Sequence, residues 1–152
     1  MTFSDGNIDV AIDDGVLNVF RHFRQTGRKL EKGGILLGQC YDNDSIVIKK
    51  ASTPTKFDKS HRFNFFRDKR LAQLFIDYEF LNSNGKTIYL GEWHTHPEDC
   101  PTSSGTDVKM IKNQFNKNRI NEDFLIMIIV GRKSFYVCYF DGKRIIQLNR
   151  SE

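Results

Sequence analysis

Two histidines separated by one residue, within the run Gly91-Glu92-Trp93-His94-Thr95-His96-Pro97, are the side chains of this sequence best suited to chemistry. Alternate residues of a strand project to the same face, so both imidazoles can reach one metal ion. Asp107 follows ten residues or so later and can return from a following helix as a third ligand. Three protein ligands leave one coordination position open for water, which is typical of a zinc site that hydrolyses its substrate.

Each part of this pattern also has a structural explanation when it is taken alone. An isolated His-x-His pair is more often two ordinary histidines at the end of a strand. Ser104 and Asp107 have the spacing of a helix N-cap with an acidic residue at the third helical position. Their co-occurrence favours one site, in which the Ser104 hydroxyl and the start of the helix point at an anion held near the metal.

An amide-cleaving zinc site also needs a base that takes a proton from water and returns it to the leaving amine. Two glutamates compete for this role. Glu92 lies two residues before His94 and therefore on the same strand face. Glu31 lies just before Gly33-Gly34, where a substrate or a neighbouring backbone could pass closely. The physical chemistry of these residues does not choose between them.

Three segments together resemble the JAMM (MPN+, JAB1/MPN/Mov34) family of zinc metalloproteases: Glu31-x-Gly33-Gly34-Ile35-Leu36-Leu37-Gly38, His94-Thr95-His96-Pro97 and Ser104-x-x-Asp107. The resemblance implies that His94, His96 and Asp107 bind Zn²⁺. It implies that Glu31 is the general base and that Ser104 stabilises the oxyanion. Glu92 then has no assigned role, and we expect it to be the partner of a ligand histidine or of a nearby cation.

The same resemblance implies a single JAB1/MPN-type domain over residues 1–152. Its fold is α/β (α+β), with a curved mixed or antiparallel β-sheet flanked by about three helices. The family cleaves ubiquitin-like proteins from their conjugates after a C-terminal glycine, so the resemblance implies a zinc-dependent isopeptidase or peptidase.

Residues 91–98 and the compact length are most similar to the standalone bacterial enzymes of CBASS anti-phage systems. The expected substrate is then a protein with a conjugated, ubiquitin-like C-terminal tail, such as a cyclic-nucleotide synthase (CD-NTase). Two other classes stay open: a non-catalytic MPN-type scaffold that binds proteins, and a zinc hydrolase that acts on another class of substrate.

Composition limits the remaining functions. The chain has 23 basic and 19 acidic residues, and their interspersion makes a nucleic-acid partner an unfavoured prediction despite the net charge of +4. The longest apolar run, 124–130, is too short to cross a bilayer, and the acidic start of the chain does not resemble a signal peptide. Three cysteines without paired spacing favour free thiols, so we expect a cytoplasmic protein with no membrane association.

Apolar periodicity predicts the elements that carry the site. We expect helices at 14–26, from about 71 to 84, and at 107–118. We expect strands at 35–41 and 45–51, joined as a hairpin, at 62–66, and at 87–96. The last three strands should form an antiparallel meander at 124–130, 134–140 and 144–148.

Overall fold

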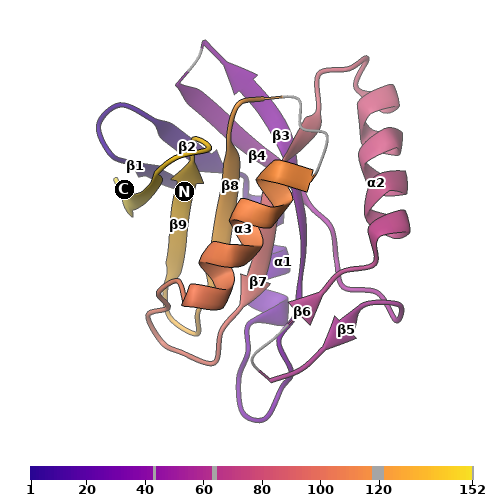
Figure 1. Ribbon diagram of the computed structural model, residues 1–152, viewed down its shortest axis with the longest axis vertical. Coiled ribbons are helices and arrows are strands. Elements are labelled where there is room, and N and C mark those ends of the chain that lie inside the picture. The colour runs from indigo at the N-terminus through magenta and orange to yellow at the C-terminus, as the bar shows by residue number, and fades with distance from the viewer. Residues whose placement is uncertain (43, 63–64, 118–121, 152) are drawn as a thin grey trace.

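A computed structural model describes residues 1–42, 44–62, 65–117 and 122–151 of the chain, and within these residues eight strands form one sheet that closes on itself (Figure 1). The order around the sheet is β1-β10-β9-β8-β7-β3-β4-β2. Neighbours are antiparallel except for two pairs, β2 with β4 and β7 with β8. The strand bounds are β1 Thr2–Ser4, β2 Asp9–Ile12, β3 Gly33–Tyr41, β4 Ser45–Ala51, β7 Ile88–Thr95, β8 Leu125–Val130, β9 Phe135–Phe140 and β10 Ile145–Arg150.

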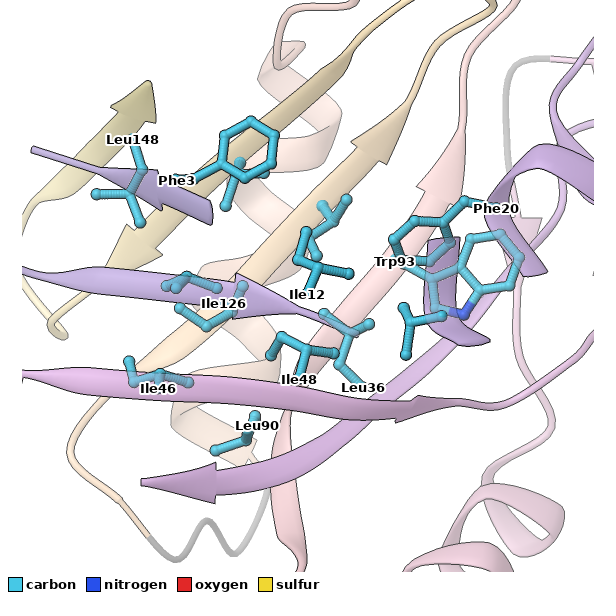
Figure 2. Close-up of a cluster of buried hydrophobic side chains, with 14 of the residues drawn as sticks. Phe3, Ile12, Phe20, Leu36, Ile46, Ile48, Leu90, Trp93, Ile126 and Leu148 are labelled. Carbon is cyan, nitrogen blue, oxygen red and sulfur yellow. The ribbon is translucent and has the colours of Figure 1, made fainter. Parts of the chain in front are cut away.

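Helices cover both faces of this sheet. Helix α1 (Asp14–Phe23) buries Val16, Leu17 and Phe20 in an inner core that includes Leu36, Leu90 and Trp93 (Figure 2). Helices α2 (Lys69–Asn82) and α3 (Gly105–Lys117) pack on the opposite face over an outer core. In Figure 1, α3 lies across the front of the strands and α1 lies behind them. A small hairpin of β5 (Lys59–Ser60) and β6 (Phe65–Phe66) precedes α2.

One extra residue in β7 sets the direction of the side chains that follow it. Leu36 of β3 pairs with Gly91, but its neighbour Leu37 pairs with Tyr89, so Leu90 is a bulge in the ladder. Leu90 and Trp93 therefore both point into the inner core, although strict alternation would place them on opposite faces. Glu92 and every second residue after it point to the outer face that α3 covers.

The predicted fold class is confirmed, and most predicted elements occur. The hairpin of β3 with β4 and the antiparallel meander of β8, β9 and β10 form as expected. The first helix ends at Phe23 rather than at residue 26, because the chain turns extended at Arg24. The strand expected at 62–66 is limited to β6, with residues 63–64 outside the described part, as is residue 118 at the end of the third helix.

The second helix, expected from about 71 to 84, forms at Lys69–Asn82. Leu74, Tyr78 and Leu81, three of the apolar residues on it, are exposed, while Ala72 and Glu79 are buried. In the part of the chain that the structure describes, no helix has the length and apolar content needed to cross a membrane.

Because of the bulge, we expect any side chain at Gly91 to lower the folding stability strongly. This residue has φ of 155°, and a Cβ atom there would lie 1.8 Å from the carbonyl oxygen of Ile126 on β8. We expect Gly91→Ala to lower the free energy of unfolding by about 3 kcal/mol or more. Gly15→Ala in α1 is the matched control, because its Cβ would meet nothing within 4 Å and should change stability by less than about 1 kcal/mol. Urea denaturation of both variants measures the difference, and equal stability would show that β7 does not need the close approach.

Candidate metal centre

The end of β7 places two histidines side by side on the outer face of the sheet. Gly33 and Gly34 of β3 pair with His94 and Trp93, and β8 flanks β7 on its other side. His94 and His96 are 2% and 8% exposed, and their ring centroids lie 5.0 Å apart. Two imidazoles so nearly sealed from water need polar partners, because a buried polar group without one is costly.

The first turn of α3 supplies the carboxylate that faces both histidines. Asp107 Oδ1 lies 2.9 Å from His94 Nε2, and Asp107 Oδ2 lies 3.2 Å from His96 Nε2. The same carboxylate accepts a hydrogen bond from the Ser104 backbone N–H, and the Ser104 hydroxyl accepts one from the Asp107 N–H. This is a reciprocal capping box, so Asp107 fixes the start of the helix and the position of the site together.

Glu31 reaches the same place from the loop that precedes β3. Its carboxylate and the ring nitrogens of His94 and His96 all lie within 4.8 Å of one another. The side chain is 4% exposed, and burial raises the pKa of Glu31 to about 8, with the negative Asp107 adding to the rise and His96 opposing it. A carboxyl whose pKa is close to neutrality is suited to taking and returning a proton.

Several atoms of this cluster that could coordinate a metal ion make no hydrogen bond to the part of the protein that the structure describes. Glu31 Oε2, His94 Nδ1 and His94 Nε2 are buried and make no hydrogen bond within the described residues, even though His94 Nε2 is close to Asp107. His96 Nδ1 lies 2.9 Å from the Glu98 carboxylate, which orients the ring so that Nε2 faces the cluster. Two imidazoles and one or two carboxylates that converge on an unsatisfied point are the donor set that zinc prefers. The residues fit a metal ion.

Glu92 lies on the same face of β7 but binds elsewhere. Its carboxylate accepts a hydrogen bond of 2.7 Å from Arg67 Nε and one of 3.1 Å from the Tyr89 hydroxyl. Arg67 also donates from Nη2 to the side-chain oxygen of Gln114 on α3, at 3.3 Å. Burial raises the pKa of Glu92, while the Arg67 guanidinium opposes that rise. Glu92 is therefore the partner of a nearby cation in the structure.

A groove leads into the cluster between β6 and α3. It has a volume of about 410 Å³, and Glu31, His94 and Asp107 are among the residues that line it. Phe65 and Phe66 form one wall, and the opposite wall comes from α3. Further lining residues are Gly34, Arg67, Lys69, Glu92, Trp93, Thr106, Lys109, Met110, Asn113 and Gln114. Its largely apolar walls and polar base have the character of a pocket that binds an extended ligand.

The structure brings Glu31, His94, His96 and Asp107 into one cluster, as the sequence analysis expected from three motifs that are separate in the chain. Ser104 stands next to them at the helix start and is exposed. Sequence reasoning missed a further set of residues that support the cluster. These are the residues Gln25, Arg67, Tyr89, Glu98 and Gln114, and apart from the position of Glu98 beside His96, no local pattern marks them.

The sequence and the fold are those of a JAB domain. The family model for prokaryotic homologs of the JAB domain matches residues 13–139, and the chain belongs to this family. The predicted resemblance is thereby confirmed. A protein of Desulfitobacterium hafniense whose solution structure is known superposes with a TM-score of 0.62 over 91% of this chain and 88% of its own, at 17% identity, which shows the fold alone.

Two curated relatives are similar over most of the chain, and a third is similar over less than half of it. The CD-NTase/cGAS isopeptidase of Pseudomonas aeruginosa is 34% identical over 122 residues, covering 80% of this chain and 76% of the relative. The protein with the same name from Escherichia coli is 36% identical over 129 residues, covering 85% and 76%. A probable metalloprotease of Sinorhizobium fredii is 34% identical over 68 residues, covering 45% of this chain and 42% of its own.

The buried Glu31 predicts a pH-dependent stability in the metal-free protein. Its pKa is about 8 when folded and near 4.5 otherwise, so between these values the folded chain holds a proton that the unfolded chain releases. Stability should therefore fall as pH rises through this range, by on the order of 2 kcal/mol between pH 6 and pH 8. Glu31→Gln cannot titrate and should show a clearly shallower decline in urea denaturation with chelator present. Parallel declines in the two proteins would contradict a raised pKa.

The Arg67–Glu92 ion pair predicts that removing Arg67 alone lowers folding stability more than removing both residues. The Arg67 and Glu92 side chains are only 14% and 10% exposed. Arg67→Met leaves a buried carboxylate unpaired and should cost about 3–5 kcal/mol of folding stability. The double variant Arg67→Met, Glu92→Leu should recover much of that loss. Lys133→Met, which breaks an exposed contact to Asp99, is the control and should cost less than about 1 kcal/mol. A double variant less stable than Arg67→Met alone would argue against the pairing.

Proposed function

We propose that this protein is a zinc-dependent isopeptidase that removes a CD-NTase from ubiquitin-like conjugates formed through its C-terminal tail, as part of bacterial anti-phage defence. The observation that carries the proposal is the convergence of Glu31, His94, His96 and Asp107 in one cluster, of which Glu31, His94 and Asp107 line one groove. Membership of the JAB family and the names of the relatives, which are isopeptidases and a probable metalloprotease, support a hydrolase with this chemistry.

We assign His94, His96 and Asp107 as the zinc ligands. Ligand atoms at about 2.0–2.1 Å from a tetrahedral zinc stand about 3.3 Å apart, close to the 2.9 and 3.2 Å between the Asp107 carboxylate and the two ring nitrogens. Glu31 also lies near both rings and could complete a ligand set. Its raised pKa favours a role in proton transfer, because a direct ligand must stay ionised.

A zinc ion bound there would act as a Lewis acid toward water and toward the scissile carbonyl. Glu31 takes a proton from the attacking water and delivers it to the leaving amine, so that the amide C–N bond breaks and no net proton is consumed. The Ser104 hydroxyl accepts a hydrogen bond from the Asp107 N–H. Its own O–H is therefore available to donate a hydrogen bond to the oxyanion of the tetrahedral intermediate. Glu98 holds the His96 ring in the orientation that the site needs.

The groove supports a polypeptide substrate. An extended chain that ends in small residues could lie between the Phe65–Phe66 wall and α3 with its scissile bond at the cluster. The CD-NTase is proposed as the conjugated protein because the relatives in Pseudomonas aeruginosa and Escherichia coli are named for it. The exposed Cys100 and half-buried Cys40 are free thiols, which supports a reducing cytoplasm as the compartment.

Two alternatives are tested by the same experiment. A non-catalytic scaffold would bind proteins without needing the cluster, and a hydrolase of another class would bind zinc without cleaving a tail. A raised pKa at Glu31 and unsatisfied donors on His94 favour catalysis over a purely structural role.

The test is cleavage of a fusion in which a CD-NTase tail ending in glycine is joined to a reporter protein. Zinc-loaded wild type should cleave it after the glycine. Glu31→Gln should lose a factor of about 10²–10⁴ in rate and keep its zinc, whereas His94→Ala should lose zinc and activity together. Asp9→Asn, an exposed substitution on β2, is the control and should stay fully active. Full activity in Glu31→Gln would contradict the assignment of Glu31 as the general base. A wild-type protein without bound metal would contradict the assignment of the protein as a zinc enzyme.

A further inference from the structure

One fully buried polar side chain joins the loop before Glu31, the loop at Arg62 and strand β7. Gln25, in the loop after α1, has no exposed surface. Its Nε2 donates to the carbonyl of Lys29 at 2.9 Å and to the carbonyl of Arg62 at 2.7 Å. Its Oε1 accepts a hydrogen bond of 3.1 Å from the Thr95 hydroxyl. Both amide hydrogens and the side-chain oxygen are used, so the orientation of the amide is determined by its neighbours.

The partners of Gln25 are adjacent in sequence to the groups that hold the Glu31 backbone. The Glu31 N–H donates to the carbonyl of His61, the residue before Arg62. On the other side of Glu31, the Lys32 N–H donates to the Thr95 hydroxyl at 3.0 Å. The Lys32 carbonyl in turn accepts the Thr95 N–H at 2.8 Å. The backbone around Glu31 is thus held on one side by the Thr95 hydroxyl, which Gln25 binds, and on the other by the neighbour of Arg62, whose carbonyl Gln25 binds.

Thr95 connects this arrangement to the histidines. It lies between His94 and His96 in β7, and its side chain points away from theirs because alternate residues face opposite sides of a strand. Thr95 is fully buried, and its hydroxyl both donates to Gln25 and accepts from Lys32. A shift of this hydroxyl would therefore move Glu31 relative to both rings.

We propose that Gln25 is a positioning residue that sets the distance between the Glu31 carboxylate and the His94–His96 pair. This inference rests on the proposed function, since it assigns Glu31 as the general base. Gln25 touches neither the substrate nor the metal ligands' ring nitrogens, and it acts through Thr95 and the 61–62 loop. Small displacements of a general base lower the rate of the chemical step more than they lower substrate affinity.

The test compares three variants. Gln25→Met removes the amide, Thr95→Val replaces the Thr95 hydroxyl by a methyl group of similar size, and Thr95→Ser keeps the hydroxyl. In zinc-loaded protein cleaving the tail fusion, Gln25→Met and Thr95→Val should each lower kcat by about 10- to 100-fold, with KM and zinc content unchanged. Thr95→Ser should have a kcat close to that of the wild type. The double variant should be no slower than the slower single variant, because both act on Glu31 through one network.

Two further measurements separate positioning from general destabilisation. Val10→Ala, in the inner core, serves as a control of lowered stability and should keep its kcat. Hydrogen–deuterium exchange should quicken at the Glu31 and Lys32 amides of Gln25→Met by about tenfold or more, while the Ile128 and Val137 amides of the β8–β9 ladder stay protected.

Each result has a defined meaning. An unchanged kcat in Gln25→Met, or a loss of kcat that follows its zinc content, overturns the positioning role. Wild type that cleaves no tail overturns the proposed function instead, and in that case the exchange measurement alone decides whether Gln25 holds the Glu31 segment. Unchanged exchange at Glu31 and Lys32 then overturns the inference.

Discussion

The single extra residue at Leu90 determines which face of the sheet carries the site. Without this bulge, strict alternation would continue from the inward-pointing Leu90 and turn the histidines of β7 into the inner core. With it, Trp93 fills that core against Phe20 of α1, at 5.2 Å between ring centroids, and His94 faces α3. Gly91 makes the bulge feasible because its backbone lies against β8 too closely for a Cβ atom. The apolar core and the cluster of Glu31, His94, His96 and Asp107 therefore depend on the same local irregularity.

Asp107 couples the start of α3 to that cluster. As the acidic member of the capping box it satisfies the Ser104 N–H, and with its two oxygens it faces His94 and His96. The Asp107 carboxylate contributes to a raised pKa at His96 despite burial, and the two histidines beside Asp107 lower the pKa of its carboxyl well below its usual range although burial opposes this. The capping explanation for Ser104 and Asp107 is thus confirmed, and the same Asp107 carboxylate faces both histidines, so the two explanations are compatible.

The parts of the structure that follow from local pattern were predictable, and the parts that follow from tertiary contact were not. The apolar run at 124–130 bounded by turn residues predicts a strand, and β8 forms there. The three-residue strand Thr2–Ser4, which closes the sheet against β10, is too short to show a period. The first helix stops before its expected end because the chain turns extended at Arg24, and the next residue, Gln25, is fully buried by partners from distant loops. The burial of Glu92 depends on Arg67, twenty-five residues away, and no motif joins them.

The most direct test of this account is the position of zinc among the four clustered side chains. Anomalous diffraction at the zinc edge, on crystals grown with zinc, measures it without reference to a substrate. We expect a single strong peak at about 2.0–2.1 Å from a ring nitrogen of His94 and of His96 and at about 2.0–2.2 Å from an Asp107 oxygen, with the Glu31 carboxylate outside coordination distance. Direct coordination by Glu31 in place of Asp107, or a peak elsewhere in the molecule, would contradict the assignment of ligands and base on which the proposed chemistry depends.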